Sequence, residues 1–293
     1  MQLEKIVRLK NYKILPVACS LGNTSFEYSG PLLFLNYLKH QHPLFFKACS
    51  DLIDHSSDIV DLDAQIFDFN TELAQEITKV LENDQVPIIL GGDHSIAMGT
   101  WSALTLYYQA EKNFGLIWID AHLDLHTVDT SPSGNVHGMP MGYLLGLGEH
   151  EFKKILSERT KFAPEHIVFI GIRDYEDQEW ERIQALGIKV YKVDEVHKRG
   201  VREVFSEAYD YLSSKVDVMG ISLDLDVFDP SYTDDVATPV PNGLCPDDMY
   251  ETLQQYSGDE KIKALEIVEF TPKENYMKTN KIIYNLMNHF IPS

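Results

Sequence analysis

A short apolar run that ends in closely spaced metal-ligand side chains most constrains how this chain can fold. Residues 115–119 are apolar and lead directly into Asp120, His122 and Asp124. Side chains two residues apart in an extended backbone point to the same side, so these polar groups would gather at one strand end. Acidic groups that continue a buried strand are costly unless they are paired or bind a metal. The pattern favours a strand ending in a metal site over a solvated loop with scattered charges.

Similar apolar runs recur along the chain and alternate with stretches of helical periodicity. The predicted strands are residues 14–18, 86–90, 115–119, 166–170, 188–190, 216–223 and 262–268. The predicted helices are residues 71–82, 96–109, 178–186, 201–212, 247–256 and 275–290, with a candidate helix over 32–40 after a loop over 22–30. Alternating strands and helices are typical of a parallel sheet with helices on both faces. We therefore predict an α/β fold, a single three-layer domain over residues 1–293 with a mostly parallel β-sheet.

Polar clusters follow four of the predicted strands. They are residues 91–95, residues 120–124, the pair Asp224 and Asp226, and Glu269. In open parallel sheets, ligands bind beyond the carboxyl ends of the strands, so we expect these segments to meet at one edge of the sheet. Taken alone, residues 91–95 could instead be a tight turn in which Ser95 caps a helix and His94 is held by hydrogen bonds.

The residue types in these clusters indicate the kind of metal. Four carboxylates and two or three imidazoles provide mixed oxygen and nitrogen ligands. Such ligands favour a borderline or hard divalent ion such as manganese, whereas structural zinc sites commonly use cysteine thiolates. Cys19, Cys49 and Cys245 are widely spaced, so neither a cysteine metal site nor a disulfide framework is expected.

Charge and hydropathy exclude several classes of partner. The 293 residues carry a formal charge of −20 at pH 7. Nucleic acids and anionic lipids are bound by clustered basic residues, so neither partner is expected. Residues 1–15 lack the uninterrupted apolar segment of a signal peptide, and no later run reaches membrane-spanning length. We therefore expect a cytoplasmic protein whose partner is a small molecule.

Three segments together resemble the ureohydrolase family, the binuclear manganese enzymes that include arginase and agmatinase. The likeness runs from about residue 88 to residue 272 and is strongest at residues 91–95, 120–124 and 222–230, which occur in the family's order. It implies an arginase-like fold, two Mn²⁺ ions per subunit and a metal-dependent amidino hydrolase that acts on a small guanidino substrate. One ion would be held by His94, Asp120, Asp124 and Asp224, and the other by His122, Asp120, Asp224 and Asp226.

A further segment is similar to the part of arginase that binds the amino acid end of the substrate. Residues 133–140 read Ser-Gly-Asn-Val-His-Gly-Met-Pro. By resemblance, Ser133 and Asn135 would bind an amino acid carboxylate, and His137 would carry protons. Agmatinases usually lack the Ser-Gly-Asn part. Read without the family, the segment is a turn in which His137 could cap a helix.

The resemblance also assigns roles in hydrolysis. Glu269 would pair with the substrate guanidinium, and Asp124 would orient a hydroxide formed between the two ions. Thr238 would hydrogen-bond that hydroxide or an active-site water, and His137 would protonate the departing amine. With L-arginine as the substrate, the products would be ornithine and urea.

Two positions differ from the arginase pattern and leave alternatives open. Glu176 stands where the family normally has an aspartate that grips the α-amino group, and His126 stands where arginases commonly have asparagine. His126 could be a pocket donor, a second proton carrier or a solvated histidine. The substrate could therefore be agmatine or a substituted guanidino acid.

A noncatalytic metal-binding protein is a further alternative to the hydrolase. It is less favoured because neither His137 nor Glu269 is needed to retain metal. Family members are generally trimers or hexamers, so the resemblance also implies a homo-oligomer.

Overall fold

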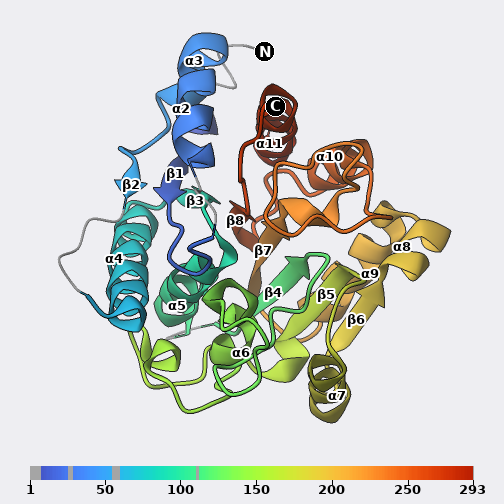
Figure 1. Ribbon diagram of the computed structural model, residues 1–293. Helices are drawn as coiled ribbons and strands as arrows, with labels where there is room; N and C mark the ends of the chain where they lie inside the picture. Colours follow the sequence, from blue (N-terminus) through green and yellow to red (C-terminus); the bar gives the residue numbers. More distant parts are fainter. Residues whose placement is uncertain (1–7, 26–28, 55–59, 110–111, 293) are drawn as a thin grey trace.

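A parallel eight-stranded β-sheet forms the centre of the computed structural model, which describes residues 8–25, 29–54, 60–109 and 112–292 (Figure 1). The strands are β1 (Tyr12–Ala18), β2 (Ile53–Asp54), β3 (Val86–Leu90), β4 (Phe114–Ile119), β5 (Ile167–Ile172), β6 (Lys189–Lys192), β7 (Val218–Asp224) and β8 (Ile262–Val268). Their order in the sheet is β2-β1-β3-β8-β7-β4-β5-β6, and every described pair of neighbours runs parallel. The predicted α/β fold with a mostly parallel sheet is confirmed.

Helices cover both faces of this sheet. One face packs against α4 (Leu62–Glu82), α5 (Ala97–Tyr108), α6 (Pro140–Leu144) and α7 (Asp177–Leu186). The other face packs against α2 (Gly30–Gln41), α3 (Pro43–Phe46), α8 (Val193–Arg199), α9 (Val201–Ser213), α10 (Pro246–Gln255) and α11 (Met277–Phe290). Short 3₁₀ turns are η1 (His94–Ile96), η2 (Val136–Gly138), η3 (Glu151–Lys154), η4 (Pro164–His166) and η5 (Leu225–Val227). Among the described helices, none is both long and apolar enough to cross a membrane.

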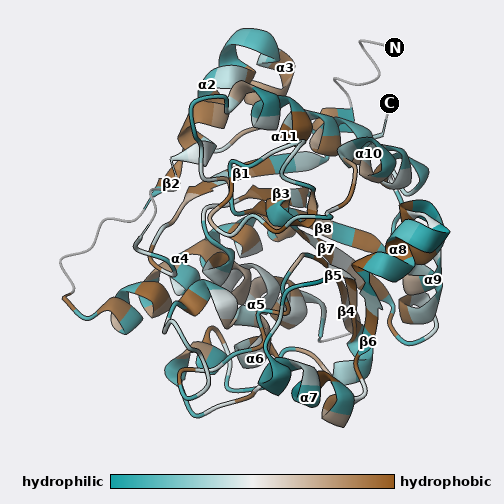
Figure 2. Cartoon of the chain, turned by 45° about the vertical axis from the view of Figure 1, so that its right-hand side comes forward, coloured by the Kyte–Doolittle hydropathy of each residue, from teal (hydrophilic) through white to brown (hydrophobic). Residues whose placement is uncertain are grey.

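Successive residues of the central strands contribute to the two separate cores. In β4, Leu116 and Trp118 pack on the α5 side, while Ile117 and Ile119 pack on the α9 side. This alternation follows from the two-residue period of a strand. Every residue of β4 is buried, which explains why its sequence is a continuous apolar run. Figure 2 shows the apolar strands enclosed by helices that carry both polar and apolar residues.

The predicted boundaries differ most at α4, which begins at Leu62 rather than at residue 71. The prediction was too short at this end. Asp61 caps the helix by accepting a hydrogen bond from the Ala64 backbone N–H at 2.9 Å, and Ile66 and Phe69 extend its buried face. The predicted helix 32–40 lies within α2, whereas part of the loop predicted over 22–30, residues 26–28, lies outside the described residues.

Gly220 permits the close approach of α5 to β7. A Cβ added at Gly220 would lie 2.1 Å from Cζ3 of Trp101. The Trp101 ring is fully buried, and its Nε1 donates a hydrogen bond to Glu266 at 3.0 Å, so it has little freedom to move. We expect Gly220→Ala to lower the free energy of unfolding by roughly 1–3 kcal/mol in urea denaturation, through overpacking.

A matched control for this substitution is Gly138→Ala. The Cβ added at Gly138 would meet no atom within 4 Å, so this variant should lose much less stability than Gly220→Ala. Equal losses in the two variants would contradict the packing explanation.

Candidate active site

Neighbouring strands bring the polar clusters to one edge of the sheet. The strands β3, β8, β7 and β4 are adjacent in that order, although they are far apart in the sequence. The segments that continue them carry His94, Glu269, Asp226 and Asp120 respectively, and Asp224 is the last residue of β7. The next strand, β5, is followed by the segment that contains Glu176. The carboxyl ends of five adjacent strands therefore supply one site.

His94 lies at the centre of the first cluster of candidate metal ligands. Its Nδ1 atom is 3.3 Å from Oδ2 of Asp120, 3.1 Å from Oδ2 of Asp124 and 3.0 Å from Oδ2 of Asp224. The His94 ring is only 1% exposed and stacks on Trp118, with ring centroids 4.0 Å apart. These four ligand atoms converge on one small volume, as the ligands of a single cation would.

Hydrogen bonds behind His94 point the other ring nitrogen away from this volume. Ser222 Oγ donates a hydrogen bond to Glu266 Oε2 at 2.7 Å, so its lone pairs can accept from His94 Nε2, which lies 3.0 Å away. In the neutral ring the proton is then on Nε2, and the lone pair on Nδ1 faces the three carboxylates. Nδ1 is buried and has no hydrogen-bond partner among the described residues. This orphaned lone pair fits a metal ligand.

His122 organises the second cluster. Its Nδ1 atom is 2.9 Å from Oδ2 of Asp226 and 3.6 Å from Oδ1 of Asp120. Asp120 therefore contributes to both clusters. Asp174 Oδ2 lies 3.6 Å from Nε2 of His122, on the other side of the ring. A carboxylate in that place is typical of the groups that orient metal-binding histidines.

The charges of the two clusters are unfavourable without cations. Burial, together with the neighbouring Asp120, raises the pKa of Asp124 to about 6. Burial and the nearby aspartates also raise the pKa of Asp224 and Asp226. Although burial opposes protonation of His94, its surrounding carboxylates raise its pKa well above the ordinary value. The raised pKa values mean that, without cations, these groups hold protons that reduce the repulsion between the carboxylates. Two divalent cations would supply the same positive charge, so this donor set fits them.

Two site residues have an uncommon backbone conformation. Asp124 has φ +48° and Glu269 has φ +65°, both in the left-handed region that few residues other than glycine adopt. Main-chain hydrogen bonds hold these conformations: Met141 N–H donates to Asp124 at 3.0 Å, and Glu269 N–H donates to Gly92 at 2.8 Å. The fold therefore imposes a local backbone cost at two candidate catalytic residues.

His137 and Glu269 form a close pair beside the metal clusters. His137 Nδ1 is 3.1 Å from Glu269 Oε1, and the same oxygen accepts the His94 backbone N–H at 2.7 Å. Burial lowers the pKa of His137, but the carboxylates of Glu269, Asp124 and Asp93 together outweigh it and raise that pKa to about 9. The imidazole can therefore hold or release a proton next to the clusters.

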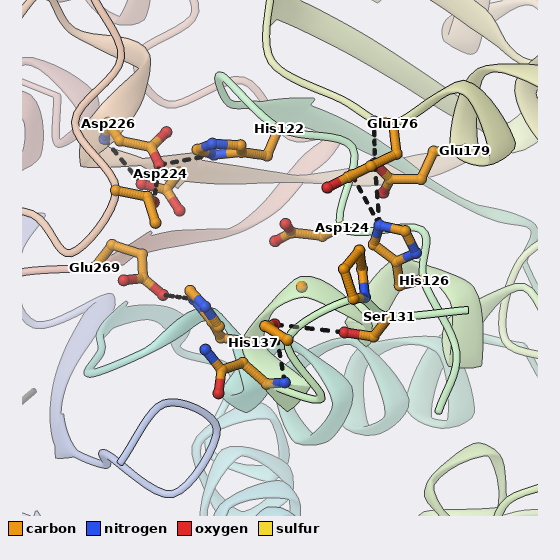
Figure 3. Close-up of a pocket in the computed structure, with 15 residues that line it drawn as sticks. His122, Asp124, His126, Ser131, His137, Glu176, Glu179, Asp224, Asp226 and Glu269 are labelled. Atoms are coloured by element: carbon orange, nitrogen blue, oxygen red, sulfur yellow. Dashed lines mark hydrogen bonds and ion pairs between the residues drawn. The ribbon is translucent and has the colours of Figure 1, made fainter. Parts of the chain in front are cut away.

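A pocket of about 160 Å³ opens above these groups (Figure 3). The predicted site residues that line it are His122, Asp124, His126, Ser133, Asn135, His137, Glu176, Asp224, Asp226, Thr238 and Glu269. The other two predicted site residues, His94 and Asp120, are buried among the ligand atoms instead. The pocket thus connects the metal clusters with the residues expected to read the far end of a substrate.

The far end of the pocket contains a cluster of one histidine and two glutamates. His126 Nε2 is 2.8 Å from Glu176 Oε2 and 3.4 Å from Glu179 Oε2. On the other side of the ring, His126 Nδ1 is 3.2 Å from Thr130 Oγ1. Burial, together with Glu176, raises the pKa of Glu179 to about 8. His126 is therefore part of a hydrogen-bonded network, not a solvated histidine.

Two of the predicted substrate residues lie at the pocket rim. Ser133 is exposed, and its Oγ accepts the Asn135 backbone N–H at 3.1 Å, which shapes the loop. Thr238 Oγ1 donates to Asp226 Oδ2 at 3.1 Å. Thr238 thus positions a candidate metal ligand, and its contact with a bound water stays a prediction.

Several residues of the site escaped the sequence analysis. Glu179 lies three residues after Glu176 and forms a capping box with it at the start of α7, a spacing that could have indicated its position. Glu266 is a fully buried acid within the apolar run of β8, which was a signal for a buried polar network. Ser222 lies in a recognised segment, but its contact with His94 required the structure.

Comparisons with known proteins agree with this geometry. The sequence pattern of the Arginase family matches residues 36–291. Arginase from Bacillus subtilis (strain 168) is 38% identical over 223 residues, which cover 76% of this chain and 74% of that protein. The native structure of arginase from Bacillus caldovelox superposes with a TM-score of 0.83 at 31% identity, covering 96% of this chain and 98% of that one.

A more distant structure shares the fold. Formimidoylglutamase from Bacillus subtilis matches with a TM-score of 0.76 at 22% identity, over 95% of this chain and 85% of that one. Family pattern and sequence identity together show that this chain belongs to the Arginase family. The predicted class, an arginase-type hydrolase that acts on a C–N bond, is thereby confirmed.

Removal of divalent cations should make stability depend on pH in a specific direction. The raised pKa values of Asp124, Asp224 and Asp226 mean that the cation-free folded state keeps protons that the unfolded chain releases. Their stabilising effect is lost as pH rises from about 4 upward, with Asp124 titrating near 6. The pKa values of His94 and His122 are also raised, so the loss of stability continues at pH values above the ordinary pKa of histidine.

Differential scanning fluorimetry can test this expectation. The melting temperature of chelated protein should fall relative to that of Mn²⁺-loaded protein as pH rises from about 4 to about 8, because cations bind the deprotonated ligands. Groups outside the site titrate in both the chelated and the Mn²⁺-loaded protein, so their contribution cancels when one melting temperature is subtracted from the other at each pH. A constant difference across this range would contradict a cation site built from these residues.

Proposed function

We propose that this chain hydrolyses the guanidinium group of L-arginine to ornithine and urea with two Mn²⁺ ions. One observation carries the proposal: the pocket that the His137–Glu269 pair lines is also lined by part of a donor set for two cations. A protein that only bound metal would have no use for that pair. The names of the similar arginases support the choice of arginine.

The two clusters and the family resemblance together indicate which residues would hold the two ions, and the place of Asp224 at the second ion rests on the resemblance. His94, Asp120, Asp124 and Asp224 would bind one ion, and His122, Asp120, Asp224 and Asp226 would bind the other. When bound, a pair of divalent ions lowers the pKa of a water molecule between them, which supplies a nucleophile at neutral pH. Mixed carboxylate and imidazole ligands suit manganese among such ions.

The side chains beside the metal centre would position and protonate the substrate. Glu269 would pair with the guanidinium group and hold its carbon towards the metal centre, because a buried carboxylate binds a planar cation strongly. Asp124 would orient the attacking oxygen by accepting its hydrogen bond, and Thr238 would support that arrangement through Asp226. His137 would give a proton to the departing amine.

The far end of the pocket would read the amino acid part of the substrate. Ser133 and Asn135 on the rim would donate hydrogen bonds to the α-carboxylate. Glu176 would accept from the α-amino group, while His126 holds the Glu176 carboxylate in place. Because His126 and Glu176 differ from the usual arginase residues, a different guanidino compound, such as agmatine or a guanidino acid, remains the second candidate.

Urea release by metal-loaded protein tests the proposal. Purified protein is loaded with Mn²⁺, its metal content is measured, and urea is assayed with L-arginine, agmatine and 4-guanidinobutanoate. Release from L-arginine above the other two compounds is the expected result, with chelated protein as the control. Preference for another compound would favour the second candidate. No urea from any compound, with metal present, would favour a noncatalytic metal-binding protein.

His137→Ala should separate catalysis from metal binding. The imidazole of His137 contacts Glu269 and Asn23. Its loss should lower kcat by about 10²–10⁴-fold, as expected when a general acid is removed. Metal content, measured by inductively coupled plasma mass spectrometry, should stay close to that of the wild type. Loss of metal together with activity would show that His137 supports the cations instead.

His126→Ala should weaken recognition of the amino acid end. Without the 2.8 Å contact to His126, the Glu176 carboxylate loses one of the partners that hold it and keeps its capping box at the start of α7. We expect KM for L-arginine to rise roughly 3–10-fold, the loss of about one hydrogen bond, with kcat changed less than KM. His126→Asn retains a donor and should lie closer to the wild type. A lower KM in His126→Ala would show that His126 competes with the substrate for Glu176.

Three broader properties extend the proposal. We propose that residues 1–293 form one domain, because both cores pack on the same sheet. A cytoplasmic location agrees with Cys19, Cys49 and Cys245, which are free thiols. The family resemblance supports a homo-oligomer, either a trimer or a hexamer, which size-exclusion chromatography with light scattering would measure.

A further inference from the structure

A loop after β1 packs against the base of His137. The Gly22 backbone N–H donates to Asp93 Oδ2 at 3.0 Å, and the His137 backbone N–H donates to the Gly22 carbonyl at 3.2 Å. A Cβ at Gly22 would lie 2.3 Å from Asp93 and 2.7 Å from Ser95, so only glycine permits this approach. The loop is therefore fixed between the segment that follows β3 and η2, which carries His137.

The next residue of this loop, Asn23, reaches the ring of His137. Asn23 is only 3% exposed, and its Nδ2 atom is 3.2 Å from His137 Nε2. Its Oδ1 atom accepts the Ser25 backbone N–H at 3.3 Å. Because a backbone N–H must meet an acceptor, this second bond fixes the orientation of the amide, with its N–H₂ group towards the histidine.

The orientation of Asn23 determines which nitrogen of His137 carries the proton. An amide N–H₂ group only donates, so in the neutral ring His137 Nε2 accepts and carries the lone pair. The proton of the neutral ring is then on Nδ1, from which it donates to Glu269 Oε1 at 3.1 Å. Glu269 lines the pocket and Asn23 does not, so the proton lies on the side of the imidazole next to the pocket.

We propose that Asn23 is a positioning residue that holds His137 in the Nδ1–H tautomer and in the ring orientation required for proton transfer. This inference rests on the proposed function, since it assumes that His137 moves protons in hydrolysis. Asn23 does not line the pocket, and its described side-chain hydrogen bonds go to His137 and Ser25, so it would act through the imidazole. The loop that carries it showed no recognisable motif around this residue in the sequence.

The charged groups around His137 determine how its pKa responds to Asn23. Glu269 contacts the ring directly, and Asp93 and Asp124 act on it at longer range, so all three favour the imidazolium. The N–H₂ group of Asn23 opposes them because it binds the lone pair that a proton would occupy. Removing Asn23 should therefore raise the pKa of His137, whereas an aspartate at position 23 should raise it further.

The first test reads the tautomer directly and needs no activity. The full-length chain, labelled with ¹⁵N-histidine and loaded with diamagnetic Zn²⁺, is studied by NMR above the pKa of His137, with His137→Ala used to assign the signal. We expect a protonated Nδ1 and an unprotonated Nε2. A protonated Nε2 in the neutral ring would overturn the proposal, even if the protein released no urea.

The second test compares variants at position 23. Asn23→Ala should raise the pKa of His137 by about 0.5–1 unit in the same NMR titration and lower kcat by roughly 3–10-fold, as expected for one hydrogen bond, with little change in KM. The basic limb of the pH–rate profile should move to higher pH together with the pKa of His137. Asn23→Asp should give a larger pKa shift than Asn23→Ala.

Thr24→Ala is the matched control, because Thr24 is the exposed neighbour of Asn23 in the same loop. It should leave the pKa of His137, the pH–rate profile and kcat unchanged. An unaltered pKa and tautomer of His137 in Asn23→Ala would overturn the proposal, whatever happens to the rate. If Asn23→Ala and Thr24→Ala lowered the rate and shifted the pKa of His137 equally, the loop would act through its overall conformation and not through Asn23, which would also overturn the proposal.

Discussion

Mutual repulsion among four buried carboxylates is the constraint on which the rest of this structure depends. Asp120, Asp124, Asp224 and Asp226 are nearly inaccessible and lie around two histidines. Burying charges of one sign is costly unless cations balance them. The raised pKa values of three of these groups express that cost in the cation-free protein. A pair of divalent ions removes it, so metal binding and the stability of this edge of the sheet are coupled.

The sheet makes such a concentration of charge geometrically feasible. Strands β3, β8, β7 and β4 end side by side, and their hydrogen-bonded backbones hold the ligand segments at fixed spacings (Figure 1). Apolar side chains pack above and below these strands and bury both faces of the sheet. Behind the ligands, buried partners such as Ser222 and Glu266 orient the imidazole of His94. The apolar cores thus hold the strands rigidly, and the segments at the strand ends carry the candidate metal ligands.

The two ends of the pocket relate differently to the Arginase family. At the metal end, the ligand types and their spacing resemble the ureohydrolase pattern, and main-chain hydrogen bonds hold Asp124 and Glu269 in place. At the far end, His126 forms a network with Glu176 and Glu179 (Figure 3). A network of this kind sets how strongly Glu176 can attract another cation. In the proposed function, the reaction depends on the groups at the metal end, whereas the choice of substrate depends on His126 and Glu176 at the far end.

The sequence by itself determined the parallel α/β fold, the positions of most strands along the chain and the types of the candidate metal ligands. Continuous apolar runs and the spacing of polar residues after them involve residues close together in the sequence, so one sequence is enough to recognise them. Only the tertiary structure decided which groups meet across long separations: Ser222 and Glu266 behind His94, Glu179 beside His126, and Asn23 against His137. These contacts arise from strand order and loop packing. Local patterns indicate that Glu179 caps a helix and that Glu266 is buried, but not which groups they meet. For the same reason, the tautomer of His137 follows from a residue 114 positions away.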